Sequence, residues 1–119
     1  MTLFIVEDDQ IQSLILEMMV KKLGLRHIGS EAYGKNAVNK ILDDKPDIIL
    51  LDVMLKDSFN GIDVAQRVKQ VYDPVIIYIT GNSDDAHKSR AEKHGFHDFI
   101  SKPISIHKLK DSIESIRVA

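Results

Sequence analysis

The chain has 119 residues, 44% of them hydrophobic, which suits one globular domain with a single core. Sixteen basic and eighteen acidic residues give a net charge of -2, so electrostatics gives no reason to expect nucleic acid or an anionic membrane as a partner. The absence of cysteine excludes a disulfide framework and a thiolate zinc site. The first residues do not resemble a signal peptide and no apolar run could span a membrane, so we expect a soluble cytoplasmic protein.

Short apolar runs, which predict strands, alternate along the chain with segments whose apolar residues recur at helical spacing. In chain order they predict a strand at 2–6, a helix at 10–23, a strand at 26–32, a helix at 35–44, a strand at 47–52, a helix at 62–71, a strand at 75–80, a helix at 83–94, a strand at 97–101 and a helix at 106–116. This alternation predicts an α/β fold in which a parallel sheet has helices on both faces.

Several residues at the ends of the predicted elements support these boundaries. Asp9 and Ser105 can cap the helices that follow them, and Gly24 can end the first helix. Tyr33-Gly34 is typical of a turn. The helix at 83–94 is almost wholly polar, with Ser83 or Asp84 as cap candidates, and we expect it to be weakly anchored.

The segment from Asp47 to Asp52 is the centre of this pattern. Its four apolar residues, Ile48 to Leu51, run without interruption and predict a strand that is buried on both faces. Asp52 would then lie at the carboxyl end of a central strand, which is where open parallel sheets bind ligands. From this position alone, Asp52 could equally carry chemistry or cap the next turn.

Polar side chains also follow the other predicted strands. Glu7 and Asp8 follow the first, Thr80 ends the fourth, and Lys102 follows the fifth. Three carboxylates gathered at one edge would repel one another, and Mg²⁺ with oxygen ligands is the simplest remedy. A lysine and a hydroxyl group suit an oxyanion, and aspartate can accept a phosphoryl group as an acyl phosphate.

In this order and at this spacing, Glu7-Asp8, Asp52, Thr80 and Lys102-Pro103 resemble the receiver domain of bacterial two-component response regulators. The resemblance covers essentially the whole chain, residues 1–119. It implies a flavodoxin-like sheet of five parallel strands in the order 2-1-3-4-5, flanked by five helices. It also implies a phosphorylation-controlled signalling module, which assists its own phosphotransfer and dephosphorylation but is not an enzyme in the usual sense.

The resemblance further implies a role for each residue of the site. Asp52 would accept a phosphoryl group from a sensor histidine kinase or a phosphotransfer protein. Asp8 would bind Mg²⁺ directly and Glu7 directly or through water, with Asp52 and the backbone carbonyl of Met54 as further ligands. Lys102 would contact the phosphoryl group.

Two more residues would report phosphorylation to the rest of the domain. Thr80 would hydrogen-bond the phosphoryl group and shift with it, and Phe99 would turn inward as the aromatic switch. The fourth helix, fifth strand and fifth helix would form the output face toward a downstream protein or a fused output domain, and could pair two copies as a homodimer. The resemblance implies a cis bond between Lys102 and Pro103, and no direct contact with nucleic acid or membrane.

The loop after Asp52 departs from the family's common pattern. It is one residue longer than usual, Lys56 stands where a proline is frequent, and Asn60-Gly61 replaces Asp-Gly. Met54 and Asn82 occupy positions that tune phosphoryl lifetime in the family. These departures concern local geometry and dephosphorylation rate, and leave Asp52 as the expected acceptor.

Other interpretations stay open on the residues alone. The acidic residues after the first strand could be a charged loop, Lys102 a solvated lysine and Phe99 a core residue. A Mg²⁺-dependent phosphohydrolase would need a second aspartate where Met54 stands, and a flavin phosphate would meet the acidic loop. A receiver-like module could bind a partner without phosphorylation. The histidines show no regular metal-binding motif.

Overall fold

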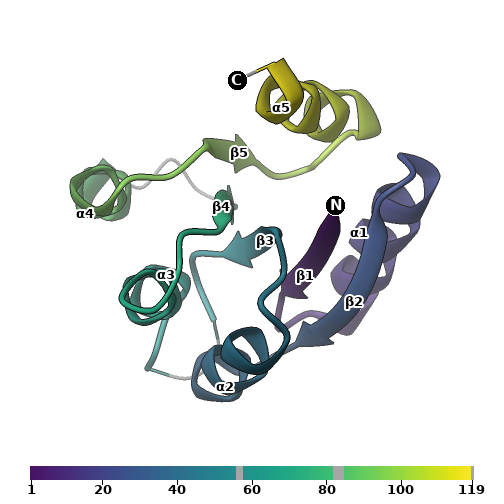
Figure 1. Cartoon of the computed structure of the whole chain (residues 1–119). Helices are drawn as coiled ribbons and strands as arrows, with labels where there is room; N and C mark the ends of the chain where they lie inside the picture. The colour runs from purple at the N-terminus through teal and green to yellow at the C-terminus, as the bar shows by residue number, and fades with distance from the viewer. Residues whose placement is uncertain (56–57, 82–84, 119) are drawn as a thin grey trace.

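The computed structural model describes residues 1–55, 58–81 and 85–118, and it confirms the predicted alternation of strands and helices (Figure 1). The elements in chain order are β1 (Thr2–Val6), α1 (Gln10–Lys22), β2 (Arg26–Glu31), α2 (Gly34–Asp44), β3 (Ile48–Asp52), α3 (Gly61–Lys69), β4 (Val75–Thr80), α4 (Asp85–His94), β5 (Asp98–Ser101) and α5 (Ile106–Val118). Lys56, Asn82, Ser83 and Asp84 lie outside the described residues.

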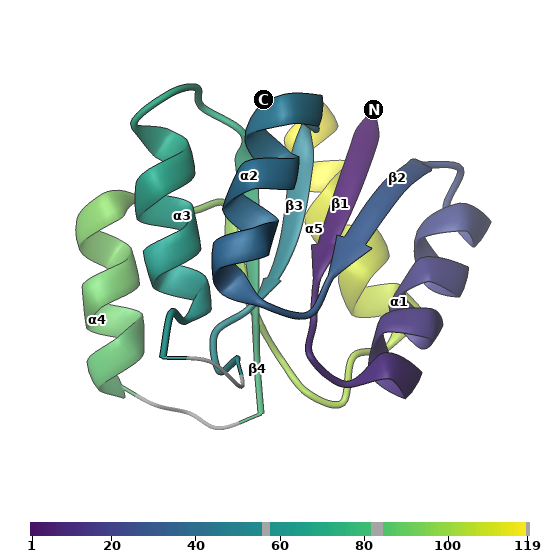
Figure 2. The same cartoon turned by 90° about the horizontal axis from the view of Figure 1, so that it is seen from below.

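The five strands form one parallel sheet in the predicted order, β2-β1-β3-β4-β5. Helices α1 and α5 cover one face, and α2, α3 and α4 cover the other (Figures 1 and 2). Every residue of β3 is buried. Its successive side chains point to opposite faces of the sheet. Leu50 packs in the core beneath α1 and α5, while Leu51 packs in the core beneath the other three helices.

Three predicted helix boundaries are confirmed by local geometry. The side chain of Asp9 accepts hydrogen bonds from the amides of Ile11 and Gln12. Gly24 ends α1 with φ of +81°, and the hydroxyl of Ser105 accepts the amide of Lys108 at 3.1 Å. These local signals lie in the sequence because a cap needs only residues that are close along the chain.

The turn predicted at Tyr33-Gly34 is confirmed only for Tyr33, which lies in the bend before α2 as its N-cap, whereas Gly34 is already the first residue of the helix. Gly34 serves a different purpose, which is close packing. A Cβ atom on Gly34 would lie 2.2 Å from the backbone oxygen of Phe59, in the segment before α3. The glycine therefore marks a contact between segments distant in sequence, which local turn statistics do not detect.

Helix α1 packs through fewer apolar residues than its sequence offers. Leu16 and Val20 are buried against the sheet, whereas four large apolar side chains are 40–71% exposed: Ile11, Leu14, Ile15 and Met18. They recur at helical spacing and form one exposed apolar stripe on α1, a feature typical of protein-contact surfaces. No helix within the described ranges is long and apolar enough to cross a membrane.

Helix α3 begins directly against the strand that carries Asp52. The amide of Gly61 donates to the backbone oxygen of Val53 at 3.0 Å. A Cβ atom on Gly61 would lie 2.1 Å from the backbone oxygen of Asp52, far inside van der Waals contact. Asn60 is the N-cap of α3 and forms a reciprocal capping box with Asp63.

We therefore expect Gly61→Ala to destabilise the fold by about 1–3 kcal/mol, because the added methyl group overpacks the Asp52 backbone. Helix propensity alone predicts the opposite sign, a gain of about 1 kcal/mol. Gly81→Ala is the matched control, since no described residue outside its immediate neighbours places an atom within 4 Å of its added Cβ. Urea unfolding of both variants measures the change in the free energy of unfolding. A Gly61→Ala protein as stable as the wild type would contradict this description of the packing.

Candidate functional site

The carboxyl ends of four strands bring the polar residues predicted from the sequence to one edge of the sheet. Glu7 and Asp8 follow β1, while Asp52 and Thr80 end β3 and β4. Lys102 follows β5, and its amide donates to the backbone oxygen of Thr80 at 2.7 Å. Asp52 and Thr80 are each only 4% exposed. The parallel topology thus gathers chemistry-bearing groups from distant parts of the chain.

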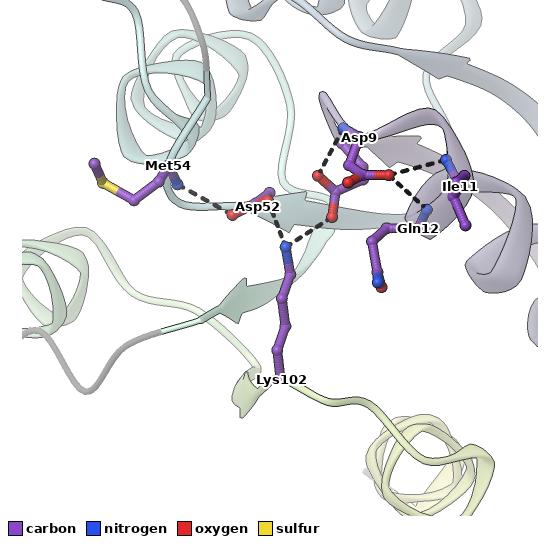
Figure 3. Close-up of polar contacts among 7 residues, drawn as sticks. Asp9, Ile11, Gln12, Asp52, Met54 and Lys102 are labelled. Atoms are coloured by element: carbon purple, nitrogen blue, oxygen red, sulfur yellow. Dashed lines mark hydrogen bonds and ion pairs between the residues drawn. The ribbon is translucent and has the colours of Figure 1, made fainter.

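The ammonium group of Lys102 joins two of the acidic residues (Figure 3). Its Nζ atom lies 2.9 Å from Oδ2 of Asp52 and 2.9 Å from Oε1 of Glu7. Glu7 is 3% exposed, so both carboxylates are removed from water and need this cation nearby. The lysine is therefore a member of the site, and the interpretation as a solvated lysine is wrong.

Backbone amides hold the other carboxylate oxygens of the same pair. Oδ1 of Asp52 accepts the amide of Met54 at 3.1 Å, and Oε2 of Glu7 accepts the amide of Asp9 at 3.2 Å (Figure 3). Asp9 thus caps α1 with its side chain and orients Glu7 with its backbone. The sequence could not show these two amides, because every residue except proline carries one.

The electrostatics of the site leave negative charge to be compensated. Burial, together with the neighbouring Asp52, raises the pKa of Glu7 above its ordinary value. Burial acts to lower the pKa of Lys102, but the hydrogen bonds to Glu7 and Asp52 outweigh it and raise this pKa. Lys102 therefore stays charged, and it is one cation beside three carboxyl groups.

The three carboxyl groups have the arrangement of a cation site. Glu7, Asp8 and Asp52 each offer one oxygen, and the three oxygens lie within 4.8 Å of one another. They border a hollow of about 380 Å³ lined by Glu7, Asp8, Asp9, Gln12, Asp52, Met54, Gly81 and Lys102. Hard oxygen donors beside a polar hollow with room for water suit Mg²⁺. No other cluster of three or more such ligands occurs among residues 1–55, 58–81 and 85–118.

Phe99 lies apart from this hollow. Its half-buried ring is 5.7 Å from the ring of Tyr78 and 5.7 Å from that of Phe96, and these aromatic residues pack in the core on the α4 side of the sheet. Its predicted switching role stays a prediction, as does that of Thr80. The bond between Lys102 and Pro103 is cis, as the resemblance implied.

Comparisons with known proteins agree on one family. The family model described as the response regulator receiver domain matches residues 3–114. The response regulator ArlR of Staphylococcus aureus is 32% identical over 114 residues, which cover 96% of this chain and 51% of the relative. The chain thus spans about half the length of the curated relatives it matches.

Solved structures give the same result. The signal receiver domain of a modulated diguanylate cyclase from Desulfovibrio desulfuricans G20 superposes with a TM-score of 0.89 at 31% identity, covering 96% of this chain and 90% of that one. The response regulatory domain of protein mrkE from Klebsiella pneumoniae shares the fold, with a TM-score of 0.88 at 24% identity and coverage of 99% and 96%. With its acidic cluster and lysine at the expected sheet edge, the chain belongs to the response regulator receiver domain family of two-component signalling.

Proposed function

We propose that Asp52 accepts a phosphoryl group from a sensor histidine kinase or a phosphotransfer protein, with Mg²⁺ as the cofactor. The observation that carries the proposal is the Lys102 ammonium group, which lies 2.9 Å from both Asp52 and Glu7 at the mouth of an acidic hollow. A buried carboxylate without such neighbours would be a poor acceptor, because nothing would balance the charge of the incoming phosphoryl group.

The chemistry follows from these contacts. A carboxylate oxygen of Asp52 attacks the phosphorus atom, an oxygen–phosphorus bond forms, and the bond from phosphorus to the donor nitrogen breaks. The Met54 amide and the Lys102 ammonium group hold one Asp52 oxygen each, so the carboxylate is oriented before the reaction. Lys102 has a flexible stem, and its ammonium group can follow the charge to the phosphoryl oxygens. Water later cleaves the acyl phosphate.

Glu7, Asp8, Asp52 and the backbone carbonyl of Met54 would hold the Mg²⁺ ion. When bound, Mg²⁺ supplies positive charge to the phosphoryl oxygens during the transfer. The carboxylates that bind it are the same groups that otherwise repel one another across the hollow. A bound cation would therefore stabilise the folded protein as well as the reaction.

The phosphorylated state would be reported through Thr80 and Phe99 to the surface formed by α4, β5 and α5. Thr80 ends β4 and is hydrogen-bonded to the chain just after β5, so a shift there would reach both α4 and β5. A downstream protein or a fused output domain would bind this surface. The resulting molecule is a switch, in which the chemistry serves to change a binding face.

Treatment with Mg²⁺ and acetyl phosphate is the direct test. We expect the wild-type protein to gain one labile phosphoryl group, seen by intact mass, and to gain none after the metal is chelated. Asp52→Asn should stay unmodified, because an amide oxygen is a far weaker nucleophile. An equal gain in both proteins would show that Asp52 is not the acceptor. A folded wild-type protein that binds Mg²⁺ without any gain would favour the phosphorylation-independent binding module.

Magnesium binding can be tested separately from phosphorylation. At 100 times its dissociation constant, Mg²⁺ should stabilise the wild-type fold by about 2.7 kcal/mol, and Asp8→Asn should lose most of this gain because it loses a ligand charge. Asp9→Asn is the matched control: it removes the adjacent charge but keeps a side chain that can cap α1. Thermal unfolding with and without Mg²⁺ measures the difference. Equal stabilisation of both variants would place the cation elsewhere.

Lys102→Met should leave Glu7 and Asp52 buried together without their cation. We expect a loss of about 2 kcal/mol in the absence of Mg²⁺, less than for a fully buried pair because part of Lys102 reaches solvent. Added Mg²⁺ should restore part of the lost stability, although phosphorylation by acetyl phosphate should remain slow. Lys102→Arg keeps the charge, so its free energy of unfolding in urea should be closer to that of the wild type. A Lys102→Met protein as stable as the wild type would contradict the bridging role.

A further inference from the structure

Helix α4 is attached to the domain mainly through polar contacts with α3. Among the α4 side chains that the structure describes, Ala91 is the one fully buried apolar residue. Arg90 of α4 donates from Nη2 to Oδ1 of Asp63 and, at 3.0 Å, to the side-chain oxygen of Gln66. Lys69 of α3 donates to the backbone oxygen of Gly95, just after α4, at 3.1 Å. A helix held in this way can be released at modest cost.

The two carboxylate oxygens of Asp63 accept hydrogen bonds from different parts of the structure. Oδ2 accepts the amide of Asn60 at 3.0 Å and so completes the capping box at the start of α3. Oδ1 accepts the guanidinium group of Arg90, as described above. One carboxylate thus joins the first turn of α3 to the middle of α4.

The first turn of α3 is in turn fixed to the acceptor strand. Gly61 donates its amide to Val53, the residue after Asp52, and packs against the Asp52 backbone so closely that a Cβ atom would not fit. The contacts therefore run from the Asp52 backbone through Gly61 and Asp63 to Arg90. This path is separate from the one through Thr80 and Phe99.

We propose that the Arg90–Asp63 ion pair is a latch that holds α4 in its unphosphorylated position, and that it opposes phosphorylation of Asp52. The proposal rests on the proposed function, because it names a regulator of the same site. A contact made in only one of two arrangements shifts the equilibrium toward that arrangement, and by linkage it weakens whatever favours the other. Releasing Arg90 therefore eases the movement of α4 that accompanies phosphorylation.

An ordinary surface salt bridge is the competing interpretation. Exposed pairs contribute little, but the side chain of Asp63 is only 23% exposed and that of Arg90 39%. Arg90 also bonds Gln66 with the same nitrogen, which restricts its geometry. Because α4 has few apolar anchors, even a modest ion pair forms a large share of its attachment.

The experiment compares Arg90→Met with Lys88→Met, which removes the same charge from an exposed position of α4. Hydrogen exchange of the unphosphorylated proteins should show α4 amides exchanging about threefold faster or more in Arg90→Met and unchanged in Lys88→Met. With Mg²⁺ and acetyl phosphate, Arg90→Met should also be phosphorylated about threefold faster, because the released arrangement that accepts the phosphoryl group is more populated. Arg90→Lys should restore the wild-type rate in part, because it keeps the charge but not the fork of the guanidinium group.

Each outcome decides the proposal. Faster exchange in α4 together with faster phosphorylation supports the latch. Faster exchange with an unchanged phosphorylation rate would show that the ion pair is only structural, and unchanged exchange would show that it does not hold α4. If the wild type is not phosphorylated at all, the proposed function fails, whereas the exchange data still show whether Arg90 holds the helix.

Discussion

The site depends on one cation held between two buried carboxylates. Lys102 lies 2.9 Å from both Glu7 and Asp52, and these two groups are almost completely removed from water. Without it, the charges left at the end of the central strand would repel one another in a poorly hydrated place. Beside this pair, Asp8 offers a third carboxylate oxygen within 4.8 Å of the other two. The arrangement is thus stable enough to fold and yet open to a divalent cation and an incoming phosphoryl group.

The sheet supplies the geometry that this interaction needs. Parallel strands all end at the same edge, so Glu7 and Lys102 both meet Asp52, although Lys102 lies 50 residues from Asp52 along the chain. Two hydrophobic layers hold the strands from both sides, and their separate cores leave β3 rigidly placed. Backbone amides of Asp9 and Met54 then fix the carboxylates. A rigid scaffold with polar loops at one edge is the usual basis of such a site.

The helices around this scaffold differ in how firmly they are attached. α2 and α3 bury apolar side chains along one face, whereas α4 makes polar bonds with α3 and, among its described side chains, buries only Ala91. A switch needs such a difference, because a well-packed core does not deform gradually and a loosely held element can change its position. Asp63 is placed where the two kinds of helix meet, with one oxygen on the cap of α3 and the other on Arg90.

The sequence by itself determined the order of elements, the sheet topology through the family resemblance, and which polar residues lie at the carboxyl ends of the strands. These follow from short-range patterns: apolar runs, caps such as Asp9, and polar residues at strand ends such as Asp52 and Lys102. Only the tertiary structure decided which face of α1 is buried, why Gly34 and Gly61 are glycines, and which partner each oxygen of Glu7 and Asp63 has. The physical reason is that α1 is apolar on several sides, and that close contacts and shared hydrogen bonds join segments distant in sequence, which local patterns do not encode.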